Sequence, residues 1–188
     1  MKLLKEFLSR YITLSDPQFE NLGNSLREMH LQEGDYLLRE GNICRTIGFV
    51  TQGTLRVLHF DQDGEVTRYF IPKGAIAVLP DSFRYQAPAN ENIQAVTDCR
   101  LWILRYEDLI KMYDQIPMWT RLVQKLLEEV QHQRALGRRL NMQDVRTRLQ
   151  LFNEEYPGLA QEIPIKTLAS FLRISPLELT KIRSEMAQ

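Results

Sequence analysis

The polar side chains of Ser175, Glu178, Thr180 and Lys181 stand close together near the end of the 188-residue chain. Their chemistry matches the edges of nucleic-acid bases. A lysine can donate to O6 and N7 of guanine, a glutamate can accept from N4 of cytosine, and a threonine hydroxyl can do either. Leu177, between them, can contact the methyl group of thymine. Presented together on one surface, these side chains would be able to read a base sequence.

A helix is the element that must position these side chains, and the sequence contains its start signals. Ser175 can cap the amide of Glu178, whose carboxylate can reach back to the amide of Ser175. Pro176 takes the first helical position, where its missing N–H is not needed. We therefore expect a helix over residues 175–183, and its exposed side chains should be Pro176, Leu177, Glu178, Thr180 and Lys181.

A preceding helix is expected over residues 165–172, with the small Ala169 where the two helices approach most closely. The turn between them is Arg173-Ile174-Ser175, which gives the pattern of a helix-turn-helix whose second helix enters the DNA major groove. Arg173 stands where such turns often hold glycine, and a left-handed backbone costs a non-glycine residue about 1–2 kcal/mol. The side chains expected to contact phosphates, which fix register without reading sequence, are Lys166, Thr167, Arg173 and Arg183.

The formal charge of the chain is zero, which gives DNA binding little support because cationic side chains supply the non-specific affinity. Residues 120–140 are rich in lysine and arginine, but residues 141–188 contain equal numbers of bases and acids. Two alternatives therefore stay open. One is a helical hairpin that only packs, and the other is a ligand- or partner-binding module that has lost DNA binding, which the neutral charge and Leu177 favour.

Residues 29–104 have the pattern of many short strands, with glycines between apolar runs. Residues 55–60 and 65–70 alternate in polarity on both sides of a turn that ends in Asp63-Gly64, which predicts a β-hairpin. So many antiparallel strands indicate a barrel or jelly roll. Two short amphipathic helices are expected before this region.

A long helix is expected from Pro117 to about residue 140, with a narrow apolar stripe on an otherwise charged surface. Such a stripe needs a partner. A second copy of the chain is the favoured partner because two-fold pairing is the commonest form of oligomer. Burial against the chain's own barrel is the alternative. The expected dimerisation residues are Trp119, Leu122, Val123, Leu126 and Val130.

Metal and enzyme chemistry have little support in the sequence. Cys44 and Cys99 lie far apart, and His30, His59 and His132 are scattered, so no zinc, iron–sulfur or cupin-type site has enough ligands. We expect no metal, no cofactor, no catalytic activity, and cysteines that are buried and reduced. No apolar run is long enough to span a membrane and the first residues are charged, so a cytoplasmic protein is expected.

With its elements in this order, the sequence resembles the Crp/Fnr superfamily of bacterial regulators, in particular the short Bacteroidetes members. The likeness covers nearly the whole chain. Residues 34–41, Gly-Asp-Tyr-Leu-Leu-Arg-Glu-Gly, are similar to the barrel-entry motif of cyclic-nucleotide-binding domains. Further similarity comes from residues 49–56, from the Asp63-Gly64 hairpin, and from residues 168–172, 174–176 and 179–183, which resemble the recognition motif of that group.

The resemblance implies an α+β fold with three parts. A double-stranded β-helix, or jelly roll, would form a sensor domain over residues 1–115. A dimerisation helix would span residues 116–140, and a helix-turn-helix DNA-binding domain residues 141–188. It also implies a homodimeric, sequence-specific transcription regulator on a palindromic double-stranded DNA operator, with RNA polymerase as a further partner.

Two departures from the family pattern affect the ligand and the DNA sequence. Members that bind cyclic AMP have a Gly-Glu pair and a later Arg-Ser or Arg-Thr, which are missing from residues 73–80 and 88–92 here. A buried phosphate without a cationic partner is unfavourable, so we expect no tight binding of cyclic AMP. The candidate ligand-binding residues for a different, unidentified effector are Gly74, Arg84 and Tyr85. Pro176 and Leu177 replace the Arg-Glu pair of many relatives, so base preference cannot be transferred.

Overall fold

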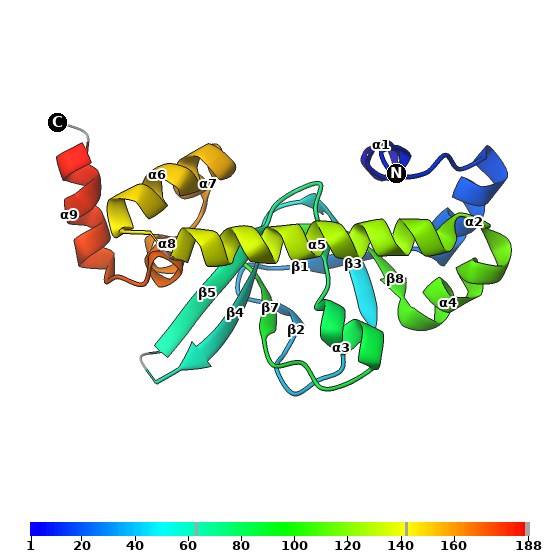
Figure 1. Cartoon of the computed structure of the whole chain (residues 1–188), viewed down its shortest axis with the longest axis horizontal. Helices are drawn as coiled ribbons and strands as arrows, with labels where there is room; N and C mark the ends of the chain where they lie inside the picture. Colours follow the sequence, from blue (N-terminus) through cyan, green and yellow to red (C-terminus); the bar gives the residue numbers. More distant parts are fainter. Residues whose placement is uncertain (63, 142, 187–188) are drawn as a thin grey trace.

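The computed structural model describes residues 1–62, 64–141 and 143–186. It is elongated, with β-sheets in the centre, a long helix along one side and helical units at the two ends (Figure 1). Asp63, in the predicted hairpin turn, lies outside the described residues. No helix in the described ranges combines the length and apolar character needed to cross a bilayer.

Among the described residues, the strands form two four-stranded antiparallel sheets that share one apolar core, which gives an α+β protein with a barrel-like sheet domain. The first sheet has the order β1-β8-β3-β6, and the second has the order β2-β7-β4-β5. The strands are β1 (Arg27–Leu31), β2 (Tyr36–Leu38), β3 (Thr46–Gln52), β4 (Leu55–Asp61), β5 (Gly64–Ile71), β6 (Ile76–Ala77), β7 (Asn92–Ala95) and β8 (Cys99–Arg105).

The predicted hairpin is the pair β4–β5, in register from Leu55 opposite Ile71 to Asp61 opposite Gly64. Arg68 is an extra residue in this ladder, because Val57 pairs with Tyr69 and Leu58 with Thr67. Such a bulge bends the strand and leaves one residue without its ladder partner.

Both cysteines are buried free thiols, as expected. Burial raises the pKa of Cys44, and it raises the pKa of Cys99 to about 11. A thiol with a raised pKa is mostly protonated at neutral pH and is a poor nucleophile. These two residues therefore act as small apolar side chains of the core.

Four helices cover the sheets at the end away from the carboxyl terminus: α1 (Lys2–Ser9), α2 (Asp16–Ser25), α3 (Pro80–Tyr85) and α4 (Tyr106–Gln115). The α2 helix is capped by Ser15, because Ser15 and Gln18 exchange backbone and side-chain hydrogen bonds. The α1 helix buries Leu4, Phe7 and Leu8 in the main core.

The long helix α5 (Trp119–Asn141) runs along the molecule and packs on the chain's own sheets (Figure 1). Its apolar stripe lies inside the main core: Trp119, Leu122, Leu126 and Val130 are all buried there. The indole Nε1 of Trp119 also donates a hydrogen bond of 3.0 Å to the carbonyl of Leu109. These four side chains are therefore not available to a second chain, and the stripe is buried as in the alternative considered from the sequence, against the chain's own barrel. Pairing with a second copy stays a prediction. The stripe packs on the same chain because the sheets leave an apolar face beside it.

A second core belongs to the carboxyl-terminal helices α6 (Val145–Glu155), α7 (Leu159–Glu162), α8 (Ile165–Leu172) and α9 (Pro176–Met186). Phe70 of β5 is part of this core. Its ring centroid lies 5.5 Å from that of Phe152 and 5.4 Å from that of Phe171. Because neighbouring residues of a strand point to opposite sides, Tyr69 and Ile71 enter the main core while Phe70 anchors the helical unit.

Candidate nucleic-acid interface

The helices α8 and α9 are joined by the three residues predicted from the sequence, Arg173-Ile174-Ser175. Arg173 ends α8 in the left-handed conformation, with φ 54° and ψ 47°. The amide of Ile174 then donates to the carbonyl of Ala169 over 3.1 Å. Ala169 is buried, as expected for a residue at a close approach of two helices. The reversal therefore depends on an unfavourable backbone conformation at an arginine.

Ser175 and Glu178 form the reciprocal cap that the sequence predicts. The amide of Glu178 donates to Oγ of Ser175 over 3.2 Å, and the amide of Ser175 donates to Oε2 of Glu178 over 2.8 Å. The hydroxyl of Ser175 also donates to that oxygen. The backbone hydrogen bond, followed by the hydroxyl, lowers the pKa of Glu178. The carboxylate of Glu178 is thus engaged at the start of α9, where it stabilises the helix.

One face of α9 points away from the rest of the protein at the end of the molecule (Figure 1). Leu179 is fully buried and anchors the helix, whereas Leu177 is 81% exposed. The hydroxyl of Thr180 donates to the carbonyl of Pro176 over 2.9 Å, which leaves its oxygen free to accept. Lys181 has no hydrogen bond or ion pair within the described part of the chain. The predicted base-reading side chains are Pro176, Leu177, Glu178, Thr180 and Lys181, and all five are exposed.

The four side chains predicted to contact phosphates are placed differently from one another. Lys166 and Arg173 are exposed. Thr167 is buried on the inner face of α8, so its hydroxyl is not presented to a ligand outside. Arg183 is partly buried, and its Nη2 donates to the carbonyl of Ala160 over 3.1 Å, which ties α9 to α7. These placements favour Lys166 and Arg173 as phosphate contacts and argue against Thr167 and Arg183.

Arg148 of α6 is a charged residue that the sequence analysis missed. Arg148 is buried, with 9% of the residue exposed. The other buried residues of α6 are Leu149 and Phe152. The signal was available, because Val145, Arg148 and Phe152 are three and four residues apart and so share a helix face. A charged residue on the face that packs against the core needs an explanation.

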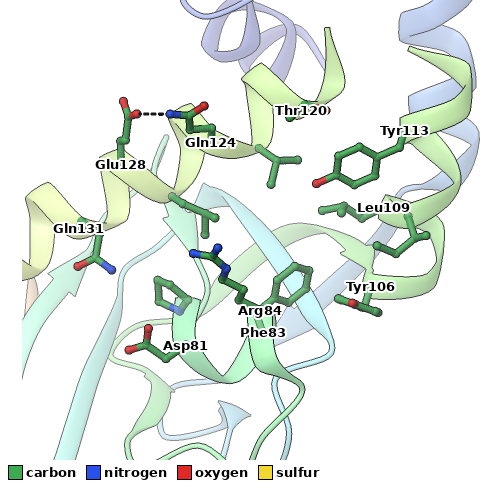
Figure 2. Close-up of a pocket in the computed structure, with 14 residues that line it drawn as sticks. Asp81, Phe83, Arg84, Tyr106, Leu109, Tyr113, Thr120, Gln124, Glu128 and Gln131 are labelled. Carbon is green, nitrogen blue, oxygen red and sulfur yellow. Dashed lines mark hydrogen bonds between the residues drawn. The ribbon is translucent and has the colours of Figure 1, made fainter. Parts of the chain in front are cut away.

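A groove of about 690 Å³ lies between α3, α4 and α5 (Figure 2). Its floor is partly apolar: Val123 and Leu127 come from α5, and Leu109 from α4. At its edge, Ile110 and Tyr113 of α4 are 45% and 40% exposed. Val123 is half-buried, so of the five predicted dimerisation residues it is the one still accessible within the described chain.

The three predicted ligand-binding residues do not form one site. The side chain of Arg84 extends from α3 into the groove (Figure 2). Tyr85 is 68% exposed and lies outside the lining, with the guanidinium of Arg84 at 5.5 Å from its ring centroid. Gly74 lies in the turn after β5 with φ +85°, and its amide donates to the carbonyl of Val50 over 2.8 Å. Gly74 therefore shapes a turn and does not line this groove.

The space between β5 and α5 is filled by the chain's own charged side chains. Oε1 of Glu91 lies 3.4 Å from Nε of Arg68, and Oε2 of Glu91 lies 3.3 Å from Nη2 of Arg134. The remaining cavity is about 30 Å³, whereas sites for small molecules usually have about 300–1,000 Å³. In the nearby loop, where the resemblance would put a phosphate-binding arginine, Ala89 is buried. Among the residues that the structure describes, this region leaves too little space for a cyclic nucleotide.

Residues 28–116 match the family described as cyclic nucleotide-binding domain. No protein with a curated description matches the chain in sequence. Solved structures with the same fold include a putative transcriptional regulator of the Crp/Fnr family from Eubacterium rectale, at a TM-score of 0.70 and 18% identity over 90% of this chain and 82% of that one. FixK2 from Bradyrhizobium japonicum has a TM-score of 0.68 and 15% identity, over 86% and 84%.

A third structure is the c-di-GMP-responsive global regulator CLP of Xanthomonas campestris, with a TM-score of 0.67, 15% identity and 92% of both chains covered. At these identities the likeness shows the fold. It covers more of the chain than the family model, which matches residues 28–116, because the three comparisons cover 86–92% of this chain.

Proposed function

We propose that this chain, which carries a cyclic nucleotide-binding domain and has the fold of Crp/Fnr family transcription regulators, is a dimeric, sequence-specific DNA-binding regulator. In this proposal residues 1–115 form the sensor domain, residues 116–140 the pairing helix and residues 141–188 the DNA-binding domain. The observation that carries it is the uncovered face of α9, with Leu177, Thr180 and Lys181 exposed on a helix that Leu179 anchors from behind.

The placement of the charges supports the same reading. Lys166, Arg173 and Lys181 are exposed on α8, the turn and α9. Glu178 is the acid in the first turn of α9, and its carboxylate is held by Ser175. The surface at the start of α9 can therefore approach the negative DNA backbone although the whole chain is neutral.

Pairing is proposed to use the groove between α3, α4 and α5, with a second copy of this chain as its occupant. The buried stripe of α5 is not accessible, but Val123, Leu127, Ile110 and Tyr113 form an apolar surface beside it. A two-fold dimer is self-complementary, so this one surface can serve both copies. To bind successive turns of a palindromic operator, the two α9 helices of such a dimer must lie about 34–36 Å apart.

Control by a small effector would require a ligand other than cyclic AMP. The ion-paired cluster of Arg68, Glu91 and Arg134 occupies the space between β5 and α5. Separating Glu91 from these two arginines would leave a buried carboxylate uncompensated, which is unfavourable. RNA polymerase is a further partner expected of a regulator of this type.

Selection of random duplexes by the purified protein, at several salt concentrations, tests DNA binding. We expect a two-fold symmetric sequence to be enriched. The variant Lys181→Ala should relax the choice of base at one position in each half-site and weaken the selected site by about 1–3 kcal/mol. Lys2→Ala is the matched control, because Lys2 is an exposed lysine on α1 at the opposite end of the molecule. Absence of any enriched sequence for the wild-type protein would refute the proposal.

Light scattering tests the pairing surface. We expect a dimer at tens of micromolar, and Ile110→Glu should shift it to a monomer because a charge would enter the apolar contact. Phe60→Glu is the control, since Phe60 is 58% exposed on the β4–β5 hairpin outside the groove. A monomeric wild-type protein, or a dimer unchanged by Ile110→Glu, would contradict the assignment.

A further inference from the structure

A small cavity lies where the long helix α5 meets strand β5. Its volume is about 30 Å³, and the described residues that line it are Arg68 and Tyr69 of β5, Glu91 just before β7, and Arg134 and Arg138 of α5. A cavity of about 10–15 Å³ is enough for one water molecule. Sites for organic molecules usually have about 300–1,000 Å³. The cavity can therefore hold one small ion but no organic ligand.

The lining of this cavity carries more positive than negative charge. Arg68, Arg134 and Arg138 contribute three guanidinium groups, and the acid among the described lining residues is Glu91. Glu91 is shared, at 3.4 Å from Arg68 and 3.3 Å from Arg134, and the exposed Asp81 outside the lining lies 3.3 Å from Nη1 of Arg134. Arg138 has no hydrogen bond or ion pair within the described part of the chain. One positive charge is therefore left without a counter-charge.

Tyr69 adds an unused hydrogen-bond donor to the same lining. It is 2% exposed, and its hydroxyl has no hydrogen-bond partner among the described residues. Burial raises the pKa of Tyr69 above its ordinary value, so the hydroxyl stays neutral and keeps its proton at physiological pH. A buried hydroxyl without an acceptor is unfavourable. An acceptor inside the cavity would remove this cost.

We propose that the cavity binds one monovalent anion of about the size of chloride. The hydroxyl of Tyr69 donates to the anion, and Arg138 supplies the charge that balances it. A water molecule could accept from Tyr69 but would leave the excess charge uncompensated, and a cation would be repelled by it. The site differs from the phosphate site of cyclic-nucleotide-binding relatives, because the position of their arginine is Ala89 here, which is not part of the lining.

The anion would contact β5 and α5 at the same time, so it would hold the long helix on the strand. Access from solvent does not require unfolding, because Arg138 is exposed and the side chain of Arg68 is 39% exposed at the rim. The buried end of the site is formed by Tyr69. The stability of this junction should therefore depend on the kind of anion in solution and not only on ionic strength.

Thermal unfolding of the full-length protein tests this dependence. Chloride replaces gluconate, an anion too large for the cavity, at constant ionic strength. Because a ligand that binds only the folded state stabilises it with the logarithm of its concentration, Tm should rise by about equal steps for each tenfold increase in chloride above the Kd. A Tm that is the same in chloride and gluconate would overturn the proposal.

Three variants separate the site from a general effect of salt. Tyr69→Phe keeps the ring and removes the donor, so in gluconate its Tm should be at least as high as that of the wild type, but it should lose the rise with chloride. Arg138→Met should lose the same rise. Arg139→Met is the matched control, because Arg139 is the next residue of α5, exposed and outside the lining, and it should keep the full dependence. A dependence kept by Tyr69→Phe and Arg138→Met would be a general salt effect and would refute the site.

Crystals grown in bromide locate the ion directly, because bromide can be identified by its anomalous scattering. We expect one bromide in the cavity, within hydrogen-bond distance of the Tyr69 hydroxyl. Water at that place would overturn the proposal. A bromide there without any chloride dependence in solution would be an adventitious ion only, which also overturns it. Neither measurement involves DNA, so the outcome is independent of the proposed function.

Discussion

Gly137→Ala changes the free energy of unfolding through two opposite effects. Alanine favours the helix locally, but its Cβ disturbs the packing of the helix against the sheet. In an exposed helix, alanine is more favourable than glycine by about 1 kcal/mol. In this structure α5 crosses β5 at Gly137, and a Cβ built there would lie 2.4 Å from the carbonyl oxygen of Arg68 and 3.2 Å from Cβ of Tyr69. The first of these is a backbone atom at the bulge of β5, so it cannot rotate out of the way.

The magnitude follows from the two effects. Overpacking of a tight contact costs typically about 1–3 kcal/mol, and a backbone clash of this depth belongs at the upper end of that range. After the gain in helix propensity, we expect Gly137→Ala to lower the free energy of unfolding by about 2 kcal/mol. For a chain of this length that corresponds to a fall in Tm of roughly 4–8 °C.

Thermal and urea unfolding of the purified variant measure this effect. Ala135→Gly is the control in the same helix: Ala135 is exposed, so its replacement should cost only the propensity difference of about 1 kcal/mol. A Gly137→Ala protein that is as stable as the wild type, or more stable, would show that α5 does not approach β5 this closely. The packing of α5 on its own chain would then have to be reconsidered.

Three further substitutions and one ligand titration test other parts of the structure. Arg173→Gly should raise the free energy of unfolding by about 0.5–1 kcal/mol, since relief of left-handed strain exceeds the entropy cost of glycine, and thermal unfolding would show a lower Tm if the strain were absent. Ser175→Ala should remove about 1 kcal/mol through loss of the cap of α9, measurable by urea unfolding, whereas no change would contradict the reciprocal hydrogen bonds. Phe70→Ala should cost about 3–5 kcal/mol and make the carboxyl-terminal helices more sensitive to limited proteolysis, and unchanged protection would argue against the anchoring role of Phe70. Calorimetry with cyclic AMP should show no binding in the micromolar range, and a micromolar affinity would refute the interpretation of the Arg68–Glu91–Arg134 cluster.

The elements that sequence reasoning predicted well are those set by local chemistry. The β4–β5 hairpin follows from alternating polarity around a glycine turn, and the start of α9 follows from the Ser175–Glu178 pair. The left-handed backbone at Arg173 was also foreseeable, because a three-residue turn requires it there. In each case the residues that decide the structure are within a few positions of one another.

The residue predictions that the structure does not support concern which partner a surface contacts. The periodicity of α5 shows that Trp119, Leu122, Leu126 and Val130 are buried, but an apolar stripe is the same whether a sheet or a second helix covers it. The packing of α7, α8 and α9 likewise decides that Thr167 is buried and that Arg183 donates a hydrogen bond to the carbonyl of Ala160. Such long-range choices are not contained in the spacing of residues along one helix.

Strand β5 joins the parts of the molecule that a regulator must connect. Its Thr67 amide donates to Oγ of Ser170 over 2.9 Å, and that hydroxyl donates to the carbonyl of Glu65 over 3.0 Å, so α8 is fastened directly to the strand. Phe70 extends the same attachment into the second core, and Gly137 brings α5 onto the strand at Arg68. A shift of β5 relative to α5 must therefore either carry α8 with it or break these hydrogen bonds. Because α9 is joined to α8 by only three residues and Leu179 is buried behind it, such a shift would change the direction in which the exposed face of α9 points.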